Sequence, residues 1–414
     1  VSEKERADQL RYLSLSKAMA ITATKNIPDS DLKGLLAMQA YNFNEAHDGE
    51  RFNADIYDGV YKALSQFKDP STNSLKGHSQ QVNVVIEGIG SGQSLFSADS
   101  EGKILKWDVR NGQVEADTIT SARKGYDTRG MIADPNGSWL IASGDYPRPD
   151  NAAFVNYFDL KSHTSKKLEG FKGVVQSLIL LPSGNEFLAL NDYGKEIVKY
   201  SLTGKTPSTF IKPSQRLNYL AMTGNGRFLA GAGNNGKVFL WDLENGNTEK
   251  VIYETPNHAI TAVQFSPSGQ QLVVGNREGE VTLLFTATGT IRRTFSEIQA
   301  TINDIKFSPN GDYLAVASYD GTLRVWNMKN LKLQPLVLSG LKDWAASLAF
   351  TNDNGYLLGG GYEGGEVRVW PMNLEQMASK LCTHIDRNLT DVEWEIYVAD
   401  LKDIPKEKTC DNVD

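Results

Sequence analysis

The stretch from Ile298 to Lys329 reads IQATINDIKFSPNGDYLAVASYDGTLRVWNMK and contains three short apolar runs. In each run apolar and polar residues alternate with a period of two, which is typical of β-strands. The first run ends at Phe307 before Ser-Pro-Asn-Gly, and the second, 313–317, is followed by Tyr-Asp-Gly. Asn-Gly and Asp-Gly are strong hairpin signals because both residues tolerate φ > 0. The stretch therefore predicts a three-stranded antiparallel meander, which is too small to bury both of its faces alone.

The same unit recurs along the chain. The glycine of the first turn recurs at intervals of 42 to 47 residues, at Gly92, Gly137, Gly184, Gly226, Gly269, Gly311 and Gly355. The aromatic residue that closes the third strand recurs at Trp107, Phe158, Tyr200, Trp241, Phe285, Trp326 and Trp370. Each series has seven members, and the period matches that of β-propeller blades. The agreement of the two series predicts a mainly β protein, a propeller with seven blades.

Short motifs in these units are similar to those of a known repeat family. Trp107-Asp108 and Trp241-Asp242 are Trp-Asp dipeptides, and Gly77-His78 supplies a Gly-His pair that opens a unit. On these residues the chain resembles the WD-repeat β-propellers. The resemblance implies a hydrogen-bonded network in the first blade, which we expect to use His78, Ser97, Glu101 and Trp107. It also implies that an outer strand from the N-terminal side completes the last blade.

The propeller is expected to span residues 70–373. Residues 1–69 predict a helical subdomain, whose first helix places Leu10, Leu13, Ala20 and Ile21 on one apolar arc. Residues 374–414 predict a short helical tail that begins after the last repeat. Ring closure requires Ser71–Lys76 to pair with the strand that ends at Trp370, because an open sheet edge would invite aggregation.

The composition excludes several functions. A net charge of −7 and a pI near 5.5 leave no broad basic surface, which argues against nucleic-acid binding. No run approaches the 18 or so apolar residues of a membrane span, so we expect no membrane insertion of this chain. The segment Gly231–Val238 nearly matches a phosphate-binding loop, but it lies in a hairpin and ends in valine instead of serine or threonine. We therefore predict no cofactor.

No catalytic or metal-binding set is predicted either. The five histidines are scattered, at His47, His78, His163, His258 and His384. The strands that should line the central channel offer mostly neutral side chains, namely Val82, Val84, Gln176, Ser177, Asn218, Thr261, Gln264, Asn303 and Asp304. A propeller enzyme would instead bring histidines or carboxylates together on the axis. The sequence thus favours a non-catalytic scaffold for protein interaction or ligand sensing, with a hydrolase or lyase that works in the central channel as the alternative.

Aromatic and arginine residues recur where the loops of one propeller face are expected. Such residues dominate binding surfaces because they bury much area at a low entropic cost. The candidates for binding a partner protein are Tyr126, Arg129, Tyr146, Arg148, Phe171, Tyr193, Arg216, Arg277, Tyr319, Trp344 and Tyr362. Two of them lie in 145–150, an insertion in the second blade that predicts either a protruding partner-binding loop or a tolerated surface insertion.

Both flanks of the repeats suggest a larger protein. The string Arg387-Asn388-Leu389-Thr390, with Glu393-Trp394 and Thr409-Cys410, is similar to the tail of bacterial STAND-type signalling NTPases. Leu35-Leu36-Ala37-Met38-Gln39-Ala40 resembles the segment ahead of their first blade. The resemblance implies a recognition module within a signalling or assembly protein, with a membrane anchor upstream in many members. It leaves two locations open, the cytoplasmic or the extracytoplasmic face of a bacterial inner membrane.

The two cysteines, Cys382 and Cys410, both lie in the tail. They are either free thiols in a reducing compartment or one disulfide that holds the tail. The family resemblance places both inside the tail motif, and an anchor upstream would allow an oxidising location.

Overall fold

The computed structural model describes residues 2–68, 74–88, 94–110, 113–121, 123, 126–146, 153–204, 206–256, 258–398 and 404–413. The chain forms two compact units. The propeller unit comprises Ser74–Met328 and Leu338–Val369, and the helical unit comprises the described residues within 1–73, 329–337 and 370–414.

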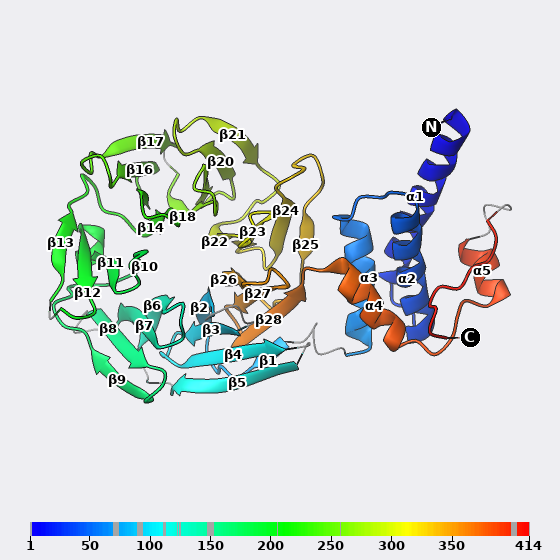
Figure 1. Cartoon of the computed structure of the whole chain (residues 1–414), viewed down its shortest axis with the longest axis horizontal. Coiled ribbons are helices and arrows are strands. Elements are labelled where there is room, and N and C mark those ends of the chain that lie inside the picture. Colours follow the sequence, from blue (N-terminus) through cyan, green and yellow to red (C-terminus); the bar gives the residue numbers. More distant parts are fainter. Residues whose placement is uncertain are drawn as a thin grey trace. The chain divides into compact units, whose positions relative to one another are not determined.

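The propeller unit is a ring of seven four-stranded sheets, as predicted (Figure 1). Blade one is β2 (Val82–Glu87), β3 (Ser94–Asp99), β4 (Ile104–Arg110) and β5 (Gln113–Thr120); blade two is β6 (Asp127–Ala133), β7 (Trp139–Asp145), β8 (Ala153–Asp159) and β9 (Thr164–Lys167). Blade three is β10 (Leu178–Leu180), β11 (Glu186–Asn191), β12 (Glu196–Ser201) and β13 (Ser208–Ile211), with the short 3₁₀ turn η2 (Asp192–Gly194) after β11. Blade four is β14 (Tyr219–Met222), β15 (Phe228–Ala232), β16 (Lys237–Asp242) and β17 (Lys250–Glu254); blade five is β18 (Ile260–Phe265), β19 (Gln271–Asn276), β20 (Val281–Phe285) and β21 (Ile291–Phe295).

The last two blades close the ring. Blade six is β22 (Ile302–Phe307), β23 (Tyr313–Ser318), β24 (Leu323–Asn327) and β25 (Leu336–Leu338). Blade seven combines β26 (Ala345–Phe350), β27 (Tyr356–Gly361) and β28 (Glu366–Pro371) with β1 (Ser74–Lys76) as its outer strand. Leu75 lies opposite Val367 in the antiparallel β1–β28 ladder, so the predicted closure is confirmed for 74–76, while 71–73 lie outside the described residues. The Leu75 side chain is buried in one apolar cluster with residues of blades one and seven, among them Trp107 and Val367.

Of the predicted turn glycines that the structure describes, all but one have a positive φ. The five glycines of the series from Gly137 to Gly311 all have φ between 70° and 79°, a range that glycine adopts without strain. Gly92 lies outside the described residues. In blade seven the residue with positive φ is Asn354 (φ 60°), not Gly355, so that prediction was wrong. Asn354 donates its backbone N–H to Thr351 as glycine does in the other turns, and asparagine tolerates the left-handed region better than most residues.

The aromatic series also needs one correction, in blade five. In blade six Trp326 lies opposite Leu314, and the residue that lies opposite Leu272 in blade five is Leu284. Leu284 is fully buried, whereas Phe285 is 44% exposed. Phe285 comes one residue later and begins the turn between the third and fourth strands, so the apolar position in this blade is filled by leucine.

The hydrogen-bonded network of blade one exists, but its acidic member is Asp99 and not Glu101. His78 Nδ1 lies 3.0 Å from Asp99 Oδ2, and His78 Nε2 lies 2.6 Å from Ser97 Oγ. Trp107 Nε1 donates to the same Ser97 Oγ at 2.6 Å. The other Asp99 oxygen, Oδ1, accepts the backbone N–H of Glu101, which explains why the two acidic residues are close in sequence but differ in role.

The helical unit contains α1 (Glu3–Ala23), α2 (Ser30–Ala46), α3 (Ala54–Gln66), α4 (Leu374–Thr383) and α5 (Asp391–Tyr397). The buried face of α1 is Ser16, Met19, Ala20 and Ala23, while Leu10 and Ile21 are 61% and 48% exposed. The predicted apolar face of α1 is therefore only partly right, since Ala20 is buried but Leu10 and Ile21 are exposed. Small residues of α1 face α2 and α3, where close helix packing leaves little room for larger side chains. No helix in the described part of the chain has the length and apolar composition needed to cross a membrane.

The predicted tail packs onto the N-terminal helices within the helical unit. Gln39 of α2, which is fully buried, donates to Glu407 and accepts from Thr409 Oγ1 at 2.7 Å each. Asn42 donates to the Thr409 carbonyl at 2.9 Å. Residues 1–69 and 374–414, which the sequence analysis treats as separate segments, thus share one core.

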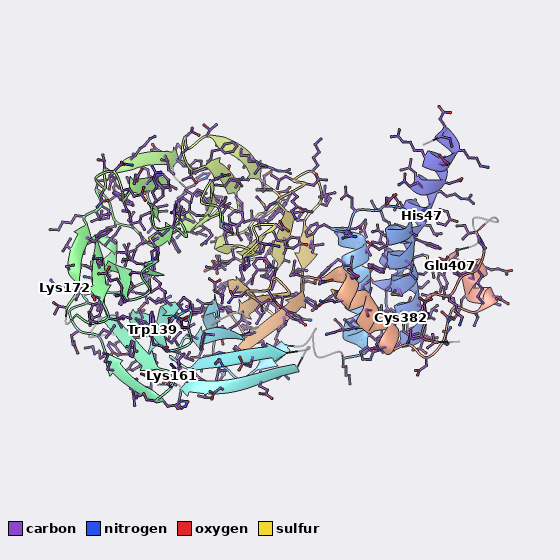
Figure 2. The ribbon with its side chains drawn as sticks, in the orientation of Figure 1. His47, Trp139, Lys161, Lys172, Cys382 and Glu407 are labelled. Carbon is purple, nitrogen blue, oxygen red and sulfur yellow. A yellow bond between two sulfur atoms is a disulfide. The ribbon has the colours of Figure 1, made fainter. Side chains whose placement is uncertain are left out.

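A disulfide joins Cys382, at the C-terminal end of α4, to Cys410 (Figure 2). Asn388 supports the same region, since its Oδ1 accepts the backbone N–H groups of Thr409 and Cys410. Arg387 pairs with Glu393 at 2.7 Å and with Asp29 at 3.0 Å. The hydrogen bonds from Arg387 lower the pKa of Glu393 to about 2, so this pair is charged at neutral pH.

The closure of the ring can be tested at Leu75. Leu75→Ala should lower the free energy of unfolding by about 2 to 4 kcal/mol, because it removes a buried side chain from the cluster beneath the β1–β28 ladder. Lys76→Ala, at the exposed next position, should change it by about 0.5 kcal/mol or less. Urea denaturation followed by circular dichroism measures both, and equal stabilities of the two variants would contradict the role of β1.

The disulfide can be tested by thiol titration. Denatured, unreduced protein should show no reactive thiol, and denatured, reduced protein should show two. Cys382→Ser with Cys410→Ser should destabilise the helical unit by about 3 to 4 kcal/mol, because the bond closes a loop with a sequence separation of 28 residues. Two thiols before reduction would show that the bond does not form.

Candidate functional site

A cavity of about 950 Å³ runs along the axis of the propeller unit. Its walls come from the first strand of each blade, β2, β6, β10, β14, β18, β22 and β26 (Figure 1). All but one of the predicted channel residues line it; the exception is Val82, which is fully buried in the apolar cluster that also holds Leu75. The cavity lining is therefore mostly uncharged, as the sequence predicts.

A bulge repeated in five of the first strands shapes one mouth of this cavity. The pairing register shifts at the second residue of β2, at the same step of β18, β22 and β26, and one residue later in β6. A bulge re-aims the side chain of the extra residue. The bulged residues, Asn83, Arg129, Thr261, Asn303 and Ala346, all line the cavity.

Two bulged asparagines connect neighbouring blades. Asn83 Nδ2 donates to Asp127 Oδ1 at 2.6 Å and to the Thr128 carbonyl at 3.1 Å. Asn303 Nδ2 donates to the Ala345 carbonyl at 2.6 Å. The side-chain amide of Asn83 thus links blade one to blade two, and that of Asn303 links blade six to blade seven. These contacts fix the relative positions of the blades at the mouth.

The charged side chains at the mouth pair with one another. Arg129 lies in β6 and not at a strand junction as predicted, and it pairs with Asp127 at 2.5 Å and with Asp145 at 3.2 Å. Burial raises the pKa of Asp127, although Arg129 and Asn83 favour its charged form. Deeper in the cavity Lys306 lies 3.7 Å from Asp304.

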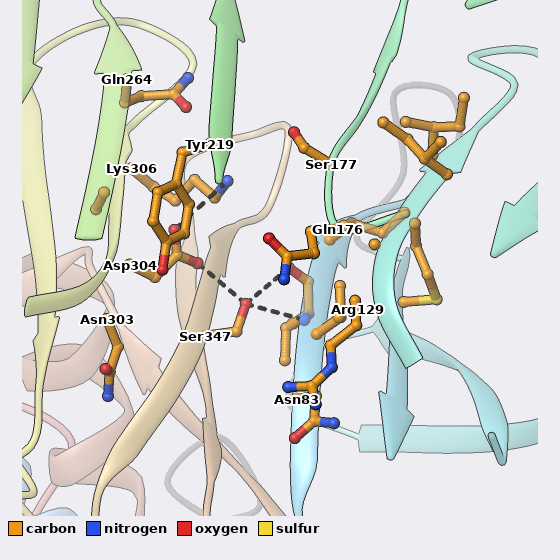
Figure 3. Close-up of a pocket in the computed structure, with 18 of the residues that line it drawn as sticks. Asn83, Arg129, Gln176, Ser177, Tyr219, Gln264, Asn303, Asp304, Lys306 and Ser347 are labelled. Atoms are coloured by element: carbon orange, nitrogen blue, oxygen red, sulfur yellow. Dashed lines mark hydrogen bonds and ion pairs between the residues drawn. The ribbon is translucent and has the colours of Figure 1, made fainter. Parts of the chain in front are cut away.

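Asp304 holds a second link between blades (Figure 3). Its Oδ2 accepts from Ser347 Oγ and from the Leu348 backbone N–H, at 3.0 Å each. Nearby, burial raises the pKa of Tyr219, so its hydroxyl is protonated and neutral at physiological pH. Figure 3 shows the Asp304 carboxylate joined by dashed lines to Ser347 and to Lys306.

Three of the predicted binding residues form a continuous aromatic strip at the mouth, made of Tyr319, Trp344 and Tyr362. The rings of Tyr319 and Trp344 are stacked with centroids 4.5 Å apart, and Trp344 and Tyr362 are 4.8 Å apart at 53°. The Tyr362 backbone N–H donates to the Trp344 carbonyl at 3.0 Å, which fixes the two side by side. Their exposed fractions are 42%, 36% and 40%, in chain order, so an apolar surface faces solvent beside a polar channel.

The remaining predicted residues do not join this strip. Phe171 packs on the core rings of Phe187 and Tyr200, with centroids 6.2 and 5.6 Å away. Tyr126 and Tyr146 pack edge to face at 4.7 Å, and burial with their hydrogen bond raises the pKa of Tyr146 to about 12. The exposed residues Tyr193, Arg216 and Arg277 do not line the cavity, and Arg148 lies outside the described residues.

Sequence reasoning missed some residues of the mouth. Asn83 was not among the predicted channel residues, because strict alternation puts Val82 and Val84 in the channel, whereas the bulge shifts the register between them. Tyr219 and Ser347 were not singled out. A polar residue at the same step of several first strands is the signal that would have pointed to the bulge. Among the described residues, no group of three or more His, Cys, Asp or Glu side chains is arranged to hold a metal ion.

The fold is that of a seven-bladed β-propeller, and two of its segments are similar to WD40 repeats. The model of the WD domain, G-beta repeat family matches residues 249–283 and 289–327, from the outer strand of blade four to the third strand of blade six.

Several proteins are similar to this chain over about two thirds of its length. Actin-interacting protein 1 from Caenorhabditis elegans is 26% identical over 290 residues, which is 66% of this chain and 44% of that protein. Autophagy-related protein 16 from Arabidopsis thaliana is 23% identical over 310 residues, 70% of this chain and 57% of that protein. The same plant's Periodic tryptophan protein 2 is 23% identical over 280 residues, 64% of this chain and 29% of that protein. The chain thus spans between about a third and just over half of these relatives, all of them eukaryotic, and they lend no support to the resemblance to bacterial NTPases.

The distinction between packed and exposed binding candidates can be tested by stability. Phe171→Ala should lower the free energy of unfolding by about 1 to 3 kcal/mol, because a half-buried ring is removed from the core of blade three. Arg216→Ala should change it by about 0.5 kcal/mol or less. Chemical denaturation of the two variants measures the difference, and an unaffected Phe171→Ala variant would return Phe171 to the binding candidates.

Proposed function

We propose that this chain is a non-catalytic recognition module whose channel mouth binds a segment of a partner protein. The observation that carries the proposal is the aromatic strip, which exposes three contacting rings beside the channel mouth. Tyr and Trp are the residues most enriched in binding hot spots. The blades hold the strip on short connections between strands, so little conformational freedom is lost on binding.

The similar proteins support an interaction role. One relative is named for its interaction with actin, and another is named a transcriptional corepressor, from Arabidopsis thaliana. The first of these names describes an interaction with another protein, and two segments of this chain match the WD domain, G-beta repeat family. The partner of this chain is accordingly a protein, and the acidic composition disfavours nucleic acid.

The state of the channel carboxylates favours binding over catalysis. Asp127 accepts from Asn83 and pairs with Arg129, and Asp304 accepts from Ser347 and a backbone N–H. A general base needs a lone pair directed at the proton that it removes. Asp127 and Asp304 are thus engaged in holding blades together, and among the described residues Glu87 is the other carboxylate of the cavity lining. The hydrolase or lyase alternative, which needs several such groups brought together on the axis, has less support.

The flanking segments support a place within a larger protein. The tail motif around Arg387 and the segment 35–40 resemble those of bacterial signalling NTPases, and we retain signalling or assembly in a bacterial cell as part of the proposal. The Cys382–Cys410 bond favours the extracytoplasmic face of the inner membrane, because disulfides persist mainly in oxidising compartments.

The proposal predicts that partner capture depends on the strip. The full chain, immobilised, should capture a specific protein from an extract of the native organism, and Trp344→Ala with Tyr362→Ala should reduce the captured amount about tenfold or more. The matched control is Val251→Ala with Ile291→Ala, which removes from outer strands two apolar side chains that are more exposed than Trp344 and Tyr362. Quantitative mass spectrometry measures the captured protein, and equal loss in both double variants would contradict a site at the mouth.

A further inference from the structure

The geometry of the strip limits the chemistry of its ligand. An aromatic cage for a methylated ammonium group needs rings that surround an open space. Here Tyr319 and Trp344 lie parallel at 9° and cover each other's faces, and Tyr362 lies against Trp344. What remains exposed is a ridge of ring edges and outer tyrosine faces, which suits a flat, apolar surface laid along it.

The strip also supplies hydrogen-bond donors. Trp344 Nε1 and the hydroxyls of Tyr319 and Tyr362 have no hydrogen-bond partner in the part of the chain that the structure describes. A polyproline II segment leaves its carbonyls unpaired and presents flat pyrrolidine rings, and proline has no N–H to satisfy. Aromatic surfaces with such donors are the recurring way to recognise these segments.

Charge beside the strip adds a second requirement. Asp343 precedes Trp344 and Glu363 follows Tyr362, and neither has a cationic partner among the described residues. The other acidic groups close to the strip in sequence are neutralised, since Asp320 pairs with Arg324 and Glu366 pairs with Lys342. Two carboxylates without a cationic partner thus neighbour residues of the strip along the chain, and they are complementary to a cationic side chain.

We propose that the aromatic strip binds a proline-containing partner segment in the extended polyproline II conformation, with a lysine or arginine next to the proline. The inference rests on the proposed function, because it names the partner chemistry of the same mouth. The proline rings lie on Tyr319 and Tyr362, Trp344 Nε1 donates to a segment carbonyl, and the cation lies between Asp343 and Glu363. Ionic strength consequently affects binding of the segment.

The probe is a fluorescent, amidated nonapeptide of alternating proline and alanine with a lysine near each end. Fluorescence anisotropy with the full chain should show saturable binding that weakens severalfold between about 50 and 300 mM salt. Trp344→Ala should weaken binding about tenfold or more, and Trp344→Phe, which keeps a ring but lacks the N–H, should weaken it less. Asp343→Asn with Glu363→Gln should reduce affinity severalfold and remove most of the salt dependence.

Controls separate this inference from the proposed function. Val251→Ala with Ile291→Ala should leave peptide affinity unchanged, and a peptide with aspartate in place of lysine should bind at least severalfold more weakly. Circular dichroism melts confirm that the Trp344 variants are folded. Absence of peptide binding, while protein capture stays sensitive to Trp344→Ala and Tyr362→Ala, overturns the partner chemistry and leaves the proposed function standing. Competition by a neutral oligosaccharide for the strip would also overturn the partner chemistry. Protein capture that is unchanged by Trp344→Ala with Tyr362→Ala would overturn both the partner chemistry and the proposed function.

Discussion

The propeller unit depends on the closure of its ring. Each four-stranded blade packs only against its neighbours, so every blade has two apolar faces that need a partner. Closure by the β1–β28 ladder supplies the missing partner for blades one and seven, whose residues share the cluster around Leu75 and Trp107. The contribution of three residues from the N-terminal side thus protects apolar surface that belongs to residues almost 300 positions away.

Within the closed ring, the repeated bulge determines what the channel mouth presents. In each of five blades it turns one residue of the first strand toward the axis. The residue type at this position differs between blades, as Asn83, Arg129 and Ala346 illustrate. Some of these side chains fasten adjacent blades, and others leave room for ligand. The aromatic strip lies beside this rim, on the connections after β23, before β26 and after β27, so a stiff frame carries the surface proposed for recognition.

Most of the fold could be predicted from the sequence, because hairpin turns and period-two strands are local signals that repeat. The errors arose where position depends on tertiary packing. Asn354 and Leu284 fill positions assigned to their neighbours Gly355 and Phe285, and only the strand register reveals the shift. For the site, the sequence offered eleven residues, and the structure groups Tyr319, Trp344 and Tyr362 because stacking joins side chains from separate connections. The cationic preference inferred for the partner could not be seen at all before the ion pairs were known.

The β1–β28 ladder also has a mechanical consequence. Ser74, where the chain enters the ring, lies opposite Arg368, and the chain leaves three residues later, after Pro371. Because the strands are antiparallel, both connections to the rest of the protein depart from the same end of the ladder. Tension between the two flanking segments would therefore load the hydrogen bonds of the β1–β28 ladder one after another. It would not load all of them at once in shear. Such a joint opens at low force, so a pull on the chain would first undo ring closure and expose the blade-one face that the Leu75 side chain covers.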